Sequence, residues 1–290
     1  MLRAGGLEAA LSPAVGGSLL HLTLDGVDLM RRAPERADDP LAMASFPLVP
    51  YANRIADGRF AVDGADYQLP LNFGDHPHSI HGFGWQANWT AKTTTASSAL
   101  LVHEHGGDAG WPWSYRAEQQ VTLTASALSM SLSVENVGDR PMPVGLGFHP
   151  YFAADAATTL RFDARSLWLS TADMLPDREA PADVLGDWSR PAIVQGDDLV
   201  DNAYAGWSGP ATIARGDGLR LLIDATGADW LHVYRPPGEA YFCLEPVSHM
   251  PDAINRGGMD MVAPGGTARL SMTIAVAKID PALPESIRPR

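Results

Sequence analysis

The sequence predicts an all-β protein built as a large antiparallel β-sandwich. Apolar residues alternate with polar ones over many short segments, which is typical of strands with one face on a core and one in solvent. The chain also contains 28 glycines and 23 prolines, which punctuate these segments as turn residues do. No segment of helical length keeps a 3.6-residue apolar period. Two sheets packed face to face would bury strands of this kind.

The first predicted strands surround two tight hairpins. Residues 20–29 alternate around Asp25-Gly26, and residues 59–70 alternate around a second Asp-Gly pair at 63–64. An Asp-Gly pair favours a two-residue hairpin turn, because both turn positions require positive φ. Each segment is therefore predicted to fold back on itself.

Later segments predict longer strands and one long connection. Residues 121–138 and 268–279 each alternate through four apolar positions. These positions are Leu128, Met130, Leu132, Val134, Leu270, Met272, Ile274 and Val276. Residues 173–198 are rich in Pro and Asp and lack periodicity, so they are expected to form a long surface connection. No linker divides the chain, and residues 1–290 are predicted to form one domain.

Composition restricts the class of protein. The 290 residues are 46% hydrophobic and 19% charged, as in globular proteins with a sizeable core. The net charge of −13 repels phosphate backbones, so no nucleic-acid partner is expected. Cys243 is the only cysteine, so we expect it to be buried in a protein of the reducing cytoplasm. No apolar run approaches the roughly 20 residues that span a bilayer, and the N-terminus lacks a secretory pattern, so no membrane partner is expected.

Four polar clusters could carry chemistry. They are Asn53-Arg54, the three histidines His76, His78 and His81, His149 within "GLGFHPYF", and Glu245 within "FCLEPVSHMPDAIN".

Glu245 and His149 each have a structural alternative. Glu245 ends a buried-strand pattern, where a carboxylate must be paired, protonated or functional. Taken alone, it is better interpreted as a rim carboxylate paired with Arg235 or Arg256. A histidine in an apolar stretch such as that around His149 is more often a hydrogen-bonded core residue than a catalyst. Taken singly, neither residue establishes a site.

The ordered set of motifs is more specific. "NRI" at 53–55, "HG" at 81–82, "HPYF" at 149–152, "DNAY" at 201–204 and "EP…PDAIN" at 245–255 follow one another along the chain. In this order they resemble the aldose 1-epimerases, or mutarotases, from "PLVPYANRI" to the last strand. The resemblance implies the galactose mutarotase-like supersandwich, which agrees with the alternation described above.

The resemblance also implies roles for six residues. Glu245 resembles the general base and His149 the general acid. His81 resembles a second histidine near the sugar ring oxygen. The substrate-binding residues implied are Asn53, Arg54 and Asp201.

Such a pair suits the opening and reclosure of a cyclic hemiacetal. A base takes the proton of the anomeric hydroxyl and an acid protonates the ring oxygen, so both act at one carbon centre. The reaction would proceed with an ionised glutamate beside a charged histidine, whose reference pKa is ~6.5. A small sugar is then the expected partner. No cofactor or metal is expected, and the chain could be a monomer or a homodimer.

Other features are given structural interpretations. His103 and His105 could share a strand face, but a solvated strand end is favoured over a metal site. His76 and His78 are expected in a loop beside the site. Trp85 is placed near the pocket, whereas Trp89, Trp111 and Trp113 could fill the sandwich or stack on a sugar.

Substrate identity stays open at this stage. After His81-Gly82 the chain continues "FGWQANW", and after Asp201 it reads "NAY", which departs from the galactose-specific branch. A hexose-6-phosphate epimerase is the alternative, but a phosphate needs clustered cations, and only Arg54 is identifiable. A non-catalytic sugar-binding protein on the same fold is the other alternative.

Overall fold

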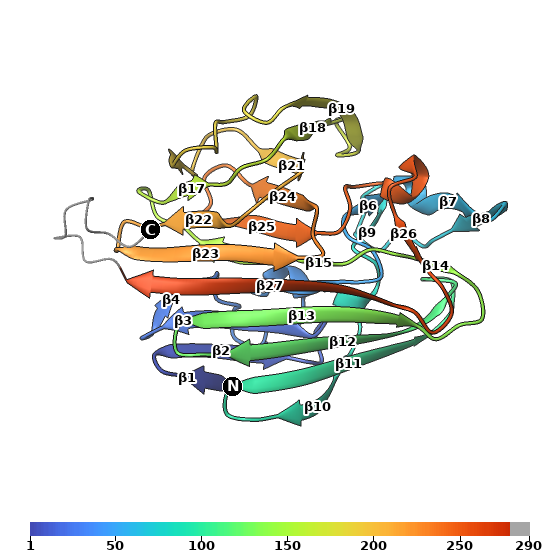
Figure 1. The fold of residues 1–290 in the computed structure, drawn as a ribbon, viewed down its shortest axis with the longest axis horizontal. Coiled ribbons are helices and arrows are strands. Elements are labelled where there is room, and N and C mark those ends of the chain that lie inside the picture. The colour runs from blue at the N-terminus through green and yellow to red at the C-terminus, as the bar shows by residue number, and fades with distance from the viewer. Residues whose placement is uncertain (279–290) are drawn as a thin grey trace.

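A computed structural model describes residues 1–278 and confirms an all-β protein of antiparallel sheets (Figure 1). The nine-stranded sheet contains, in spatial order, β10 (Thr90–Thr94), β11 (Ser98–Gly106), β12 (Ser114–Leu123), β13 (Ala127–Asn136), β27 (Thr267–Lys278), β23 (Leu219–Thr226), β22 (Ala211–Ala214), β17 (Thr159–Arg161) and β20 (Ala192–Ile193). The eight-stranded sheet contains β19 (Pro176–Pro181), β18 (Ser166–Ser170), β21 (Val200–Ala205), β24 (Trp230–Arg235), β25 (Tyr241–Val247), β15 (Gly147–Phe148) and β5 (Pro47–Leu48), with β16 (Tyr151–Ala153) also on β25.

Smaller elements complete the fold. The four-stranded sheet contains β1 (Leu2–Ala4), β2 (Leu7–Ser12), β3 (Ser18–Leu24) and β4 (Val27–Asp28). Three two-stranded pairs are β6 (Arg54–Ile55) with β9 (Ser79–Ile80), β7 (Arg59–Val62) with β8 (Ala65–Gln68), and β14 (Met142–Val144) with β26 (Asp260–Val262). Four 3₁₀ turns are η1 (Pro40–Ala42), η2 (Ala56–Gly58), η3 (Gly84–Gln86) and η4 (Ala253–Arg256). No helix among the described residues is long and apolar enough to cross a membrane.

Both predicted hairpins are confirmed. β3 and β4 pair across the first turn, where φ is 50° at Asp25 and 82° at Gly26. β7 and β8 pair across the second, where φ is 51° at Asp63 and 78° at Gly64. Positive φ at both positions is the geometry that favours this dipeptide.

The long alternating segments form adjacent strands, β13 and β27, with Met130 opposite Met272 and Leu132 opposite Leu270. Their inward positions are buried, apart from the partly buried Val276. The expectation that residues 173–198 form only a connection was wrong, because this stretch contains β19 and β20. These short strands lie at sheet ends, and β19 has little apolar alternation to reveal it.

The main apolar core lies between the nine-stranded sheet and the eight- and four-stranded sheets. Ile223 and Ile274 of the nine-stranded sheet share one buried cluster with Phe242 and Leu244 of β25. Because side chains alternate along a strand, the odd-numbered residues of β25 face the opposite side. Glu245 is thereby directed away from the main core, toward the site described next.

Candidate active site

Strand register gathers polar side chains on one face of the eight-stranded sheet. Asp201 of β21 pairs with Tyr234 of β24, and His232 of β24 pairs with Glu245 of β25. On the other edge of β25, Tyr151 of β16 pairs with Cys243, two residues before Glu245. Paired residues, and residues two apart in one strand, share a face of the sheet. The side chains of Asp201, Tyr234, His232, Glu245 and Tyr151 therefore lie on the same surface.

A cavity of about 530 Å³ opens over this face. Its size is within the range of small-molecule sites. All six residues with implied roles line it: Asn53, Arg54, His81, His149, Asp201 and Glu245. Another hollow of about 470 Å³ lies on the nine-stranded sheet, but its lining contains no histidine and offers no comparable acid-base pair.

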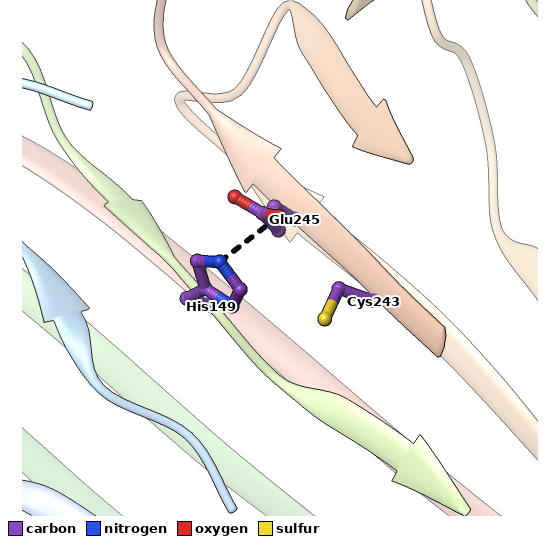
Figure 2. Close-up of side chains that lie close together, drawn as sticks. All are labelled: His149, Cys243 and Glu245. Carbon is purple, nitrogen blue, oxygen red and sulfur yellow. Dashed lines mark ion pairs between the residues drawn. The ribbon is translucent and has the colours of Figure 1, made fainter. Parts of the chain in front are cut away.

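His149 and Glu245 form the chemical centre of the cavity. His149 Nε2 lies 3.3 Å from Glu245 Oε1, and the two residues are only 7% and 1% exposed. Figure 2 shows both side chains directed toward each other, Glu245 from β25 and His149 from the segment after β15. His149 Nδ1 and Glu245 Oε2 are buried without a hydrogen-bond partner among the described residues. The alternative pairing of Glu245 with Arg235 or Arg256 is therefore wrong.

Burial opposes the charged form of both residues. It raises the pKa of Glu245 well above its usual value, and the charge of Asp201 acts in the same direction. It lowers the pKa of His149 to about 3, assisted by His232. Burial thus disfavours the ionised pair that the sequence suggested. It therefore favours the neutral pair, in which Glu245 is a protonated carboxyl group beside a neutral His149 imidazole.

Aromatic stacking fixes the His149 ring. Phe46 stacks on it at 4.6 Å between centroids and Tyr151 at 4.7 Å, each at 26°. The neighbouring glycines serve close packing. A Cβ at Gly145 would lie 1.9 Å from His249 Nε2, and one at Gly147 would lie 2.7 Å from a Val247 methyl group.

Asn53 and His81 are held together in left-handed backbone conformations, with φ of 56° and 60°. The His81 amide donates to the Asn53 carbonyl at 2.8 Å, and the Asn53 amide donates to His81 Nδ1 at 3.1 Å. Such strain at two non-glycine residues is typical of functional sites. Gly82 follows, where a Cβ would lie 2.1 Å from the Val49 carbonyl oxygen, so the "HG" pair requires its glycine.

Asp201 connects Arg54 with His232. Its carboxylate lies 2.6 Å from His232 Nε2 and 3.2 Å from Arg54 Nη2. Burial acts to raise the pKa of Asp201, but its bonds to His232 and Arg54 outweigh burial and hold that pKa below the usual value. Asn53 Oδ1 accepts from Arg54 Nη1 at 2.9 Å. The four side chains form one polar network along the cavity.

Sequence reasoning missed His232 and the role of the "PDAIN" motif. His232 could have been found, because it alternates with Trp230 and Tyr234 in a strand pattern. The motif is a clamp: the Asp252 amide donates to the Arg54 carbonyl at 2.6 Å, and Asp252 Oδ1 accepts from the Ala56 amide at 3.0 Å. It holds β6, and hence Arg54, against the site.

The other histidines and tryptophans are placed as follows. His76 and Trp85 line the cavity, as expected. His78 lies beside it and pairs with Asp173 at 3.2 Å. The expectation of a solvated strand end at His103 and His105 was wrong, because both rings pack on Tyr115, at 5.6 and 4.9 Å. The other three tryptophans of that group, Trp89, Trp111 and Trp113, belong to the buried core.

Cys243 lies next to His149 and Glu245 and is buried (Figure 2). The donor atoms of His149, Cys243 and Glu245 all lie within 4.8 Å of one another, a spacing that metal ligands also show. Burial raises the pKa of the Cys243 thiol, with Glu245 adding to the effect. The group is thereby kept as a neutral thiol, whereas metals bind the thiolate.

Comparison with known proteins gives consistent results along the chain. The family model described as aldose 1-epimerase matches residues 2–275. The protein YphB of Escherichia coli K12, itself uncharacterized, is 33% identical over 246 residues, which cover 80% of this chain and 83% of YphB. Galactose mutarotase of Rattus norvegicus is 32% identical over 105 residues, 35% of this chain and 29% of that enzyme.

Solved structures share the fold. A candidate aldose 1-epimerase from Escherichia coli K12 superposes with a TM-score of 0.88 at 31% identity, covering 96% of this chain and 98% of that one. The galactose 1-epimerase of Lactobacillus acidophilus superposes with a TM-score of 0.81 at 16% identity, covering 96% and 93%. At that identity the second match shows the fold alone.

Proposed function

The chain belongs to the aldose 1-epimerase family, and on that premise we propose that it interconverts the α and β anomers of a free aldose hexose. The observation that supports this most is the buried Glu245–His149 pair, 3.3 Å apart inside the cavity. Each partner also has a second polar atom without a hydrogen bond among the described residues. A base and an acid are therefore available to one carbon centre.

The proposed reaction moves two protons and breaks one ring bond. Glu245 takes the proton of the anomeric hydroxyl, and the electrons of that O–H bond form the carbonyl. The bond between the anomeric carbon and the ring oxygen breaks, and His149 gives its Nε2 proton to that oxygen. Rotation about the bond between the first two carbons presents the other carbonyl face, and the steps reverse.

Burial favours the protonation state that Glu245 and His149 reach once the sugar ring has opened. After ring opening Glu245 is protonated and His149 is neutral, which is the form that burial favours for this pair. Ring opening starts from the ionised form, which differs only in the position of one proton across 3.3 Å. The bound sugar stabilises that form, because its anomeric hydroxyl donates to the carboxylate and its ring oxygen accepts from the imidazolium.

The remaining residues orient the sugar. His81 Nδ1 accepts from a backbone amide, so a neutral His81 ring carries its proton on Nε2 and can donate to the ring oxygen or an adjacent hydroxyl. Burial lowers the pKa of His81 well below its usual value, with His149 adding to the effect, and so keeps the ring neutral. Arg54 and Asp201 would bind hydroxyls away from the anomeric carbon, while Asn53 fixes the guanidinium of Arg54.

Polarimetry tests this function. Freshly dissolved α-glucose and α-galactose should reach anomeric equilibrium faster with the protein than without it, in proportion to its concentration. A protein that binds these sugars without accelerating equilibration would instead be the non-catalytic sugar-binding protein considered above.

The hexose-6-phosphate epimerase is kept as a second candidate because of Arg31. The cation that the sequence offered for a phosphate, Arg54, is already paired with Asp201. The structure brings Arg31 to the cavity instead.

A further inference from the structure

Arg31 is a fixed cation in the wall of the cavity. It follows β4 in the chain, and no feature of its sequence context suggested a role. Its Nη2 donates to the carbonyl oxygens of Leu41 and Met43, at 2.5 and 2.8 Å. The guanidinium carbon also lies 3.7 Å from the ring centroid of Tyr151 and 4.7 Å from that of Tyr241. Two carbonyls and two aromatic rings therefore hold the group in one place.

The position is close to the reacting centre. The Tyr151 ring that contacts Arg31 also stacks on His149, at 4.7 Å. A substituent of the sugar that reached Arg31 would thus lie about one aromatic ring away from the proposed acid. The cavity, at about 530 Å³, has room for such a group beside a hexose.

Arg31 differs from Arg54 in its counter-charge. Arg54 is paired with Asp201 at 3.2 Å. Arg31 forms no ion pair with any carboxylate in residues 1–278, and its Nε is buried there without a hydrogen-bond partner. Leaving a partly buried charge without a counter-ion is unfavourable, and a ligand anion would relieve that cost. Neutral donors are nearby, because Tyr234 and Tyr241 line the same cavity.

We propose that Arg31 forms an anion subsite, and that the preferred substrates are aldoses carrying an anionic oxygen group, such as a phosphate or a carboxylate, away from the anomeric carbon. This inference rests on the proposed function, since it concerns the substrate of the same site. Neutral aldoses remain substrates, and the anionic group adds a charge-assisted bond to Arg31.

The test compares neutral and anionic sugars in three proteins. Equilibration of glucose, glucose 6-phosphate and glucuronate is followed by exchange NMR, with wild type, Arg31→Gln and Arg32→Gln. Arg32→Gln is the matched control, because it removes the same charge from the next residue, which is exposed and paired with Asp28 outside the cavity. Thermal unfolding verifies that each variant is folded.

In the wild type we expect kcat/KM to be at least about 10-fold higher for one anionic sugar than for glucose, the size of one bond to a charged group. Arg31→Gln should reduce this ratio toward one, and Arg32→Gln should leave it unchanged. A preference for glucose 6-phosphate identifies the group as phosphate, and one for glucuronate identifies it as carboxylate.

Two results would overturn the proposal. One is a wild-type kcat/KM that is no higher for either anionic sugar than for glucose, a result that requires no variant. The other is an Arg31→Gln protein that loses glucose and anionic activity equally, as expected if Arg31 only braces Leu41 and Met43. Turnover of glucose in the same assay separates these failures from failure of the proposed function, in which no sugar is equilibrated.

Discussion

Replacing Glu245 with glutamine should abolish most activity without disturbing the fold. Glutamine keeps the shape, and its amide N–H can donate to His149 Nε2, which lies 3.3 Å from Glu245 Oε1, in place of the carboxyl proton. It has no basic oxygen to take the anomeric proton. Loss of a general base costs about 10²- to 10⁴-fold. We therefore expect kcat/KM for any aldose substrate to fall by at least about 100-fold.

The same substitution should raise stability at neutral and higher pH. The folded-state pKa of Glu245 lies well above its ordinary value of 4.5 because of burial. The folded state then holds a proton that the unfolded state has lost, so the wild type loses stability as pH rises from about 4.5 to the folded pKa. The loss is about 1.4 kcal/mol for each unit of pKa difference. Glutamine does not titrate and escapes this loss.

The assay pairs anomer equilibration with urea unfolding at pH 5 and pH 8. The free energy of unfolding of Glu245→Gln, relative to wild type, should be higher at pH 8 than at pH 5. Glu239→Gln is the control, because Glu239 is an exposed carboxylate beside the same strand. Anomerisation within a few-fold of wild type would remove Glu245 from the mechanism. An unchanged stability difference between the two pH values would refute the argument that burial keeps its carboxyl group protonated.

Three further outcomes are expected. Asp201→Asn should destabilise the fold by up to about 3–5 kcal/mol and raise KM, because Arg54 would lose its ion pair and His232 its acceptor; equal stability by urea unfolding would contradict this. Because burial lowers the pKa of His149 to about 3, the acid limb of the kcat/KM profile should lie well below pH 6.5, and a limb at 6.5 would show that the ring is not desolvated. Dialysis against EDTA should leave activity intact, since the proposed proton transfers need no Lewis acid; a loss restored by a divalent ion would reassign His149 and Glu245 as metal ligands.

The fold could be predicted because its signals are local. Alternation in β13 and β27 and the Asp-Gly turns need only neighbouring residues to be recognised. The short strand β19 could not be found, because its six residues are mostly exposed and begin and end with proline. Its strand conformation depends on pairing with β18, a long-range contact that the local sequence does not report.

The ordered motifs pointed to six residues that line the cavity, but not to His232 or Arg31 and not to the interactions among them. His232 pairs with Glu245 only through the register of β24 and β25, which alternation within one strand cannot specify. The protonation states of Glu245 and His149 also could not be predicted from the sequence. Reference pKa values suggested an ion pair, whereas the burial of both side chains favours the neutral pair.

The ion pair between Arg54 and Asp201 changes what the sequence implied about substrate charge. Sequence reasoning gave Arg54 the task of discriminating a phosphorylated sugar from a free one, because no other cation was identifiable. In the folded chain the charge of Arg54 is compensated by Asp201, 3.2 Å away, so the two side chains together present little net charge to a ligand. Asp201, distant in sequence, thus neutralises Arg54. Within residues 1–278, the cation left without a carboxylate partner in the cavity is Arg31, which contacts two carbonyl oxygens and two tyrosine rings. Charge selectivity in this cavity should accordingly follow Arg31, while Arg54 affects neutral and charged sugars alike.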